Sequence, residues 1–161
     1  MIEAIEPHAF ITSAMMEFMN DVQLAQLALV RGSTDSVRLA MHLIDDSNRV
    51  LLEIARIATR KNLPLPRALD QHHAIILQRM REKTSADFDC AYIDMLALHH
   101  RHAVSLFRRG QTIQDPEMSA FARRVLAMIG ARIKFSRQLS GRIDSLLDGA
   151  GVPNPGAPRG L

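Results

Sequence analysis

The sequence predicts an all-α fold, a four-helix bundle with a short additional crossover helix. Three observations support this prediction. The apolar residues are mainly Ala, Leu, Ile and Met, with nine Met, one Tyr and no Trp, and this composition favours helices over strands. Apolar side chains recur at helical spacing in segments that Gly and Pro separate. No segment shows the strict alternation of apolar and polar residues that is typical of a half-buried strand.

The first two predicted helices form an antiparallel pair. They cover residues 8–31 and 34–60, each with an apolar stripe of helical period. Gly32 ends the first helix, and Ser33 or Thr34 can cap the second. A connection this short places the two helices side by side in opposite directions.

A proline-containing break and a short helix come next. The sequence Leu-Pro-Leu-Pro at 63–66 interrupts the helical pattern. A shorter pattern then covers about residues 67–83. This link can carry the chain from one end of a bundle to the other, so the next long helix starts at the opposite end.

The last two predicted helices form a second antiparallel pair. Ser85 opens a helix over about 86–109, which Gly110 closes. Asp115 then supplies an N-cap that a proline follows, and the last helix runs to about Leu147. Two antiparallel pairs joined by a long crossover have the ferritin-like connectivity.

We expect one domain and a tail. Residues 1–148 are predicted to form the ferritin-like bundle, since a chain of 161 residues can bury a full core. Residues 149–161 are rich in Pro and Gly and are predicted to be a disordered tail. No apolar run has the length of a membrane span. The start lacks the pattern of a signal peptide, so we expect a cytoplasmic protein if the chain is complete and an exported one if a signal peptide was removed.

Each long helix carries a polar residue inside its apolar stripe, near its midpoint. These residues, the central polar cluster, are Asp21, Ser47, His100 and Arg132. Four helices of similar length in a bundle bring their midpoints to one level. We therefore expect these four side chains to meet in the core.

Several stretches of the sequence carry a family resemblance. They include LPLP at 63–66, SADFDCAYIDMLALHHRHAVSLF at 85–107 and DPEMSAFARRVLAMIGARIKFSRQL at 115–139, and the most specific piece is Phe88-Asp89-x-x-Tyr92 followed by His100. These stretches resemble a bacterial domain family of unknown function in the ferritin-like superfamily. Many of its members are described as outer-membrane or exported proteins. The resemblance covers roughly residues 9–139 and implies a ferritin-like fold.

The resemblance also implies which positions could hold metal, and this chain departs from the family there. The family usually has Glu at the position of Asp21, Asp-His at the positions of Asp46 and Ser47, and His at the positions of His100 and Arg132. Of these three histidines, only His100 is present in this chain. A guanidinium is always protonated and offers no lone pair. We expect Arg132 to take the place of a cation, paired with Asp21, while Ser47 and His100 accept its remaining N–H groups.

No metal and no other cofactor is therefore expected. The alternative is a site for Fe, Mn or Zn built from Glu17, Asp21, Asp46 and His100. Glu17 lies one helical turn from Asp21, so the two could form a carboxylate pair. Asp46 is interpreted as surface charge together with Asp45, with pairing to a neighbouring helix as the alternative.

Other reactive side chains are interpreted as structural. His99 and His102 share one face of a helix and are expected to be partly exposed, and His72-His73 are adjacent and poorly placed to chelate together. Cys90 is the only cysteine, which excludes an intramolecular disulfide, and we expect a buried, inert thiol.

The leading functional prediction is a non-catalytic structural or interaction module with a degenerate metal site, which could form a homodimer through an exposed helix face. One alternative is a metal-binding or oxidoreductase bundle that uses His100 and Asp21. Another is a basic-surface module that binds an acidic partner or nucleic acid. The formal charge of +3 is too small to predict nucleic-acid binding without a patch, and no phosphate-loop or nucleophile-elbow motif occurs.

Overall fold

The computed structural model describes residues 2–149, and the side chains of residues 140 and 142–149 are outside this description. Within this range the chain forms five helices and no strand, which confirms the predicted all-α class. The predicted tail at 149–161 lies outside the described residues except for Gly149, the last residue of α5. The helices are α1 (Pro7–Arg31), α2 (Thr34–Arg60), α3 (Gln71–Arg81), α4 (Ser85–Gly110) and α5 (Pro116–Gly149).

Side-chain caps begin most of these helices where the sequence offers them. The Glu6 carboxylate accepts a hydrogen bond from the Ala9 amide, 2.9 Å away, and α1 then begins with a proline. Ser33 accepts a hydrogen bond from the Ser36 amide at the start of α2. Asp115 accepts hydrogen bonds from the first amides of α5. Each cap satisfies an amide that has no partner inside its own helix.

The short helix α3 begins four residues later than the sequence pattern predicts. Asp70 accepts a hydrogen bond from the His73 amide, 2.9 Å away, and so caps a helix that starts at Gln71. Aspartate is a strongly preferred N-cap residue, whereas the residues at 67–69 offer no side chain that caps as well. The irregular link between α2 and α3 is therefore longer than expected.

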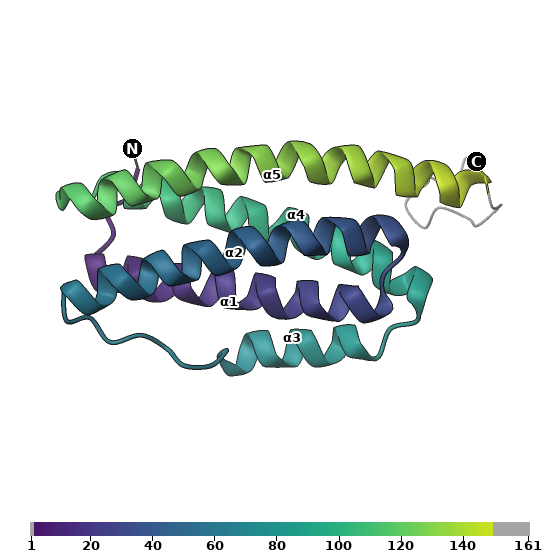
Figure 1. The fold of residues 1–161 in the computed structure, drawn as a ribbon, viewed down its shortest axis with the longest axis horizontal. Coiled ribbons are helices and arrows are strands. Elements are labelled where there is room, and N and C mark those ends of the chain that lie inside the picture. Colours follow the sequence, from purple (N-terminus) through teal and green to yellow (C-terminus); the bar gives the residue numbers. More distant parts are fainter. Residues whose placement is uncertain (1, 150–161) are drawn as a thin grey trace.

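Contacts at the helix ends define the direction of each long helix. The Ser33 amide donates a hydrogen bond to Oδ1 of Asp89, 3.0 Å away, so the turn between α1 and α2 lies beside the start of α4. At the other end, Lys61 forms an ion pair with Asp115, so the end of α2 lies beside the start of α5. Each long helix is therefore antiparallel to both of its neighbours, and α3 returns along the outside, beside α1 (Figure 1).

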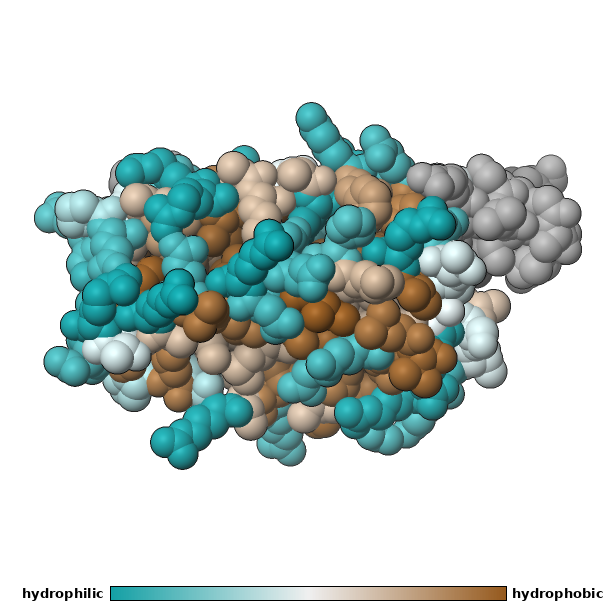
Figure 2. Space-filling model, viewed as in Figure 1, coloured by the Kyte–Doolittle hydropathy of each residue, from teal (hydrophilic) through white to brown (hydrophobic). Residues whose placement is uncertain are grey.

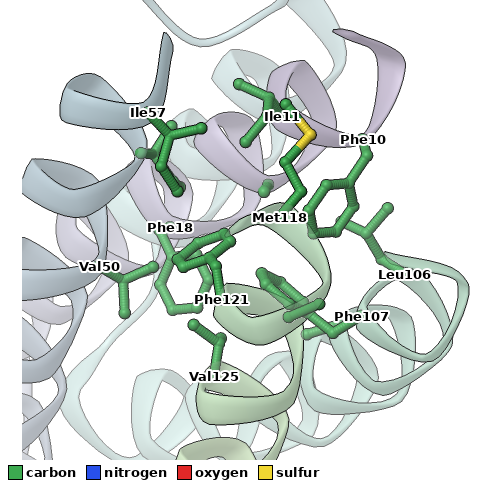
Figure 3. Packing of buried hydrophobic residues seen from close by; sticks show 14 of the residues in the cluster. Phe10, Ile11, Phe18, Val50, Ile57, Leu106, Phe107, Met118, Phe121 and Val125 are labelled. Carbon is green, nitrogen blue, oxygen red and sulfur yellow. The ribbon is translucent and has the colours of Figure 1, made fainter. Parts of the chain in front are cut away.

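An aromatic cluster fills the end of the core near the start of α1. Four phenylalanines make edge contacts there, with ring centroids 5.3–6.2 Å apart. Figure 3 shows these rings among aliphatic side chains from the four long helices. The four rings are fully or almost fully buried, and edge-to-face pairs add to the free energy gained from burial alone. They are Phe10, Phe18, Phe107 and Phe121.

A second, mainly aliphatic cluster fills the opposite end of the core. It includes Leu24, Leu39, Phe88, Tyr92 and Leu139, all at most 1% exposed. The α3 helix adds Leu77 and Met80 to this cluster from the outside. The two clusters are separated along the helices by a level that carries buried polar side chains.

The surface mixes hydrophilic and hydrophobic residues. On the face seen in Figure 2, hydrophobic residues lie between hydrophilic ones over much of the length of the molecule. Large apolar side chains that are exposed on α1, α2 and α4 include Val30, Met41, Leu52 and Leu98. None of the helices in the described part of the chain has the length and apolarity that a bilayer span requires.

Gly110 lies where the end of α4 meets the aromatic cluster, and its lack of a side chain allows this contact. A Cβ at Gly110 would lie 2.5 Å from Cε2 of Phe10, whose ring is fully buried and cannot move freely. We predict that Gly110→Ala lowers the free energy of unfolding by about 1–3 kcal/mol, the usual effect of overpacking a core. Urea denaturation followed by circular dichroism measures this change.

Gly130→Ala is the matched control. Gly130 is exposed in the interior of α5, and a Cβ there would meet nothing within 4 Å. Because alanine favours helices, this change should stabilise the protein by about 0.5–1 kcal/mol. Equal effects of the two substitutions would show that Phe10 does not limit the size of the side chain at position 110.

Candidate functional site

The level between the two apolar clusters contains the four residues of the central polar cluster. Asp21 on α1, Ser47 on α2, His100 on α4 and Arg132 on α5 are each at most 7% exposed. A buried polar or charged group destabilises a protein unless it forms hydrogen bonds. The partners of each side chain therefore decide what this level can do.

Arg132 is the centre of the hydrogen-bond network. Its Nη1 donates to Oδ2 of Asp21, 3.2 Å away, and its Nη2 donates to Oγ of Ser47, 2.7 Å away. The same Nη2 also donates to the carbonyl oxygen of Leu43, at 3.3 Å. Nε lies 3.7 Å from Oδ2 of Asp46, an ionic contact too long for a hydrogen bond. One guanidinium thus links α5 to both α1 and α2.

Aromatic packing completes the environment of this cation. The guanidinium carbon of Arg132 lies 5.4 Å from the centroid of the Phe18 ring, within the range of a cation–π interaction. Phe18 belongs to the aromatic cluster, so the polar level and that cluster meet at this ring.

The second oxygen of Asp21 faces α4. Oδ1 of Asp21 lies 3.5 Å from Nδ1 of His99. The Asn20 amide nitrogen lies 3.0 Å and 3.1 Å from the two ring nitrogens of His99, so a hydrogen bond joins these side chains. The predicted exposure of His99 was wrong, because the buried stripe of α4 is wide enough to include both His99 and His100. His102 is exposed.

His100 is buried in this level but does not bond to Arg132. Its Nε2 has no hydrogen-bond partner among the described residues. Burial lowers the pKa of His100, and the positive charge of Arg132 and the neighbouring His99 lower it further, while Asp21 opposes them. The expected hydrogen bond from Arg132 to His100 was therefore wrong, and the Leu43 carbonyl accepts an N–H group of Arg132 instead.

Glu17 lies one turn before Asp21 on α1 and is half-buried. Its Oε2 has no hydrogen-bond partner within the described part of the chain. Burial is the largest effect and raises the pKa of Glu17. The nearby His99 opposes this rise, and the negative charge of Asp21 adds to it by a smaller amount. Folding therefore disfavours the ionised form of the Glu17 carboxyl group.

The donors at this level do not fit a metal ion. Among the residues that the structure describes, no three His, Cys, Asp or Glu side chains gather closely enough to hold one. The carboxylate of Asp21 and the hydroxyl of Ser47 are already hydrogen-bonded to a guanidinium. That group has no lone pair to donate, and its charge repels a metal cation.

The remaining residues singled out in the sequence lie apart from this level. Cys90 is exposed, which corrects the expectation of a buried thiol. It lies two positions after Phe88 and two before Tyr92, and residues two apart point to opposite sides of a helix. His73 forms a hydrogen bond with the Asp70 carboxylate, 2.7 Å away, and His72 is exposed. Neither of these two histidines lies in the core.

Of the acidic pair on α2, Asp45 is exposed, whereas Asp46 is half-buried and lies near Arg132. For Asp46 the structure supports the alternative interpretation, pairing with a neighbouring helix. Part of the basic flank of α5 is also paired, because Arg124 forms an exposed ion pair with Glu53. Arg123 donates a hydrogen bond to Ser119.

The fold and the buried network define an all-helical protein whose core contains an ion pair centred on an arginine. Residues 3–139 match the family model described as a domain of unknown function, DUF4142. The match covers most of the chain, so the chain belongs to this family. Neither a curated protein nor a solved structure matched the sequence.

The ion pair between Asp21 and Arg132 can be tested with a double-mutant cycle. Asp21→Leu and Arg132→Met each leave the other charge buried without its main partner, which should lower the free energy of unfolding by about 3–5 kcal/mol. The double mutant removes both buried charges and should recover much of this loss. Chemical denaturation of the four proteins gives the coupling energy.

Glu53 and Arg124 provide the surface control for this cycle. Their ion pair is exposed, so Glu53→Gln and Arg124→Gln should each change stability by only about 0–1 kcal/mol. Additive effects of the Asp21 and Arg132 substitutions would contradict a direct interaction in the core.

The raised pKa of Glu17 predicts a pH dependence of stability. Between its unfolded and folded pKa values the native state binds more protons than the unfolded chain, so stability falls as pH rises through this interval. Glu17→Gln removes the ionisation and should raise the free energy of unfolding at pH 7. This gain should disappear at a pH below the ordinary pKa of glutamate, where the parent carboxyl is protonated in both states. The exposed Glu3→Gln is the control, and an equal gain at both pH values would disprove the assignment.

Proposed function

We propose that this chain is a ferritin-like four-helix bundle that serves as a non-catalytic structural or interaction module. The order and direction of the helices support the fold assignment. Antiparallel pairs α1–α2 and α4–α5 are joined by a long crossover that includes α3. This connectivity distinguishes ferritin-like folds from bundles in which every connection is short.

The environment of Arg132 is the observation that carries the functional proposal. Ferritin-like proteins that bind metal build the site in the bundle core, from carboxylate and histidine side chains on facing helices. In this chain the guanidinium of Arg132 lies at that level. It donates hydrogen bonds to Asp21, Ser47 and the Leu43 carbonyl. The cation is thus a side chain of the protein itself. The oxygen atoms of Asp21 and Ser47, which could otherwise face a metal ion, accept hydrogen bonds from Arg132.

Two other functions have less support. An oxidoreductase that uses His100 and Asp21 would need these side chains to share a metal, but Asp21 faces Arg132 and His99. A nucleic-acid surface would need unpaired basic residues in a continuous patch, but Arg60 and Arg124 form ion pairs with acidic residues of neighbouring helices.

Restoring histidines at positions 47 and 132 tests the proposal directly. Ser47→His with Arg132→His would place histidines at positions 47, 100 and 132 of the central polar cluster, beside the carboxylate of Asp21, a donor set that suits Zn²⁺. We expect this variant to bind about one Zn²⁺ per chain and to melt at a higher temperature when the metal is added. The parent protein, purified without a histidine tag, should contain substoichiometric Fe, Mn and Zn and should show no shift. Elemental analysis and thermal unfolding measure both quantities.

Asn48→His with Gly130→His is the matched control, because both positions are exposed on the same two helices. This control should bind metal no better than the parent. If the parent contains stoichiometric metal that His100→Ala removes, the proposal is wrong and the oxidoreductase alternative is supported. If the core variant binds no more metal than the surface control, the four positions do not converge on a site of metal size.

A further inference from the structure

A pocket lies between α4 and α5, on the side of the polar level away from the Arg132 network. Its volume is about 340 Å³, within the range of small-molecule sites in proteins. The walls include the apolar side chains of Ile93 and Val104 from α4 and of Ile133 from α5. The pocket therefore offers an apolar surface of the size that a small organic molecule can fill.

Two polar atoms without partners lie at the buried side of this pocket. His100 lines the pocket and is only 6% exposed, and its Nε2 has no hydrogen-bond partner among the described residues. Oγ of Ser136, which also lines the pocket, is likewise buried and without a partner in the described range. Buried polar atoms of native proteins are rarely left without a partner, so these two indicate a missing ligand or water.

Positive charge lies at the open side of the pocket. Arg101 and Arg137 line it and are exposed, and neither guanidinium forms a salt bridge with another described residue. No acidic residue lines the pocket. The mouth thus favours an anion, and arginine binds carboxylates through paired, charge-assisted hydrogen bonds.

A second groove of the molecule has a different character. It lies between α2 and α5, has a volume of about 200 Å³, and is lined by both Asp46 and Arg132. These two charges already lie near each other and offset each other. Of these two grooves, the one between α4 and α5 combines unpartnered buried polar atoms with positive charge that no described residue pairs.

We propose that the pocket between α4 and α5 binds a small amphipathic carboxylate, such as a medium-chain fatty acid. The carboxylate lies between Arg101 and Arg137, and the apolar body lies against Val104 and Ile133. His100 and Ser136 form hydrogen bonds with the same carboxylate from the buried side of the pocket. An imidazole that stays neutral can either donate or accept at Nε2, so His100 tolerates the anion without adding a buried charge. This site is independent of the proposed replacement of metal by Arg132.

Octanoate is the probe for this site, and isothermal titration calorimetry is the measurement. We expect saturable binding of one octanoate per chain. The neutral analogue 1-octanol should bind at least about tenfold more weakly, because it cannot form charge-assisted hydrogen bonds with arginine. Acetate should show no saturable binding, because it lacks the apolar body. Octanol that binds as tightly as octanoate, or octanoate that does not saturate, would overturn the proposal.

Two variants locate the binding. Arg101→Gln with Arg137→Gln should weaken octanoate binding about tenfold or more and leave octanol binding unchanged. Arg108→Gln, at an exposed position of α4 outside the pocket, should bind octanoate like the parent. Ala97→Phe places a ring at the exposed edge of the pocket and should abolish binding of both probes, whereas Ser105→Phe, exposed elsewhere on α4, should not. If octanoate binds equally well to the double glutamine variant, the site lies elsewhere and the assignment is wrong.

Discussion

The arrangement of the helices depends on one requirement, that the buried guanidinium of Arg132 must find acceptors for its N–H groups. Removing a cation from water costs several kcal/mol, and only well-placed acceptors offset that cost. Here the acceptors come from Asp21 on α1 and from Ser47 and the Leu43 carbonyl on α2. A shift of α5 by one helical turn, about 5.4 Å, would separate the guanidinium from all three. The network therefore selects one alignment of three helices.

The apolar clusters and the polar level contribute in different ways. Burial of the phenylalanines and of the aliphatic residues at the other end provides most of the driving force, but apolar contacts alone tolerate small shifts along a helix. The polar level adds specificity between the clusters. The α4 helix is the exception, because it joins the network through the contacts of His99 with Asp21 and Asn20 and not through a hydrogen bond with Arg132. The pocket opens beside this less constrained helix.

The sequence could predict much of the fold, because the responsible signals are local. Asp115 and Ser33 mark helix starts through their own side chains, and helix lengths follow from the apolar period. The burial of Asp21 and Arg132 could also be predicted, from their positions within the apolar stripes of their helices. The acceptor role of the Leu43 carbonyl could not, since every residue has a carbonyl and only the tertiary arrangement shows which one faces a cation. The burial of His99 depends on the width of the buried stripe, which neighbouring helices set.

The shared acceptors of Arg132 also restrict how such a core can change during evolution. A descendant that loses the arginine keeps Asp21 buried without its main partner, and a descendant that loses Asp21 keeps the unpaired cation. Either single step carries a penalty that only a second change on a different helix relieves. Positions 21, 47 and 132 should therefore be inherited as a set, and lineages should differ by exchange of the whole set. Asp46, which lies near Arg132 but outside this set, is freer to change, because its half-exposed carboxylate can turn toward water.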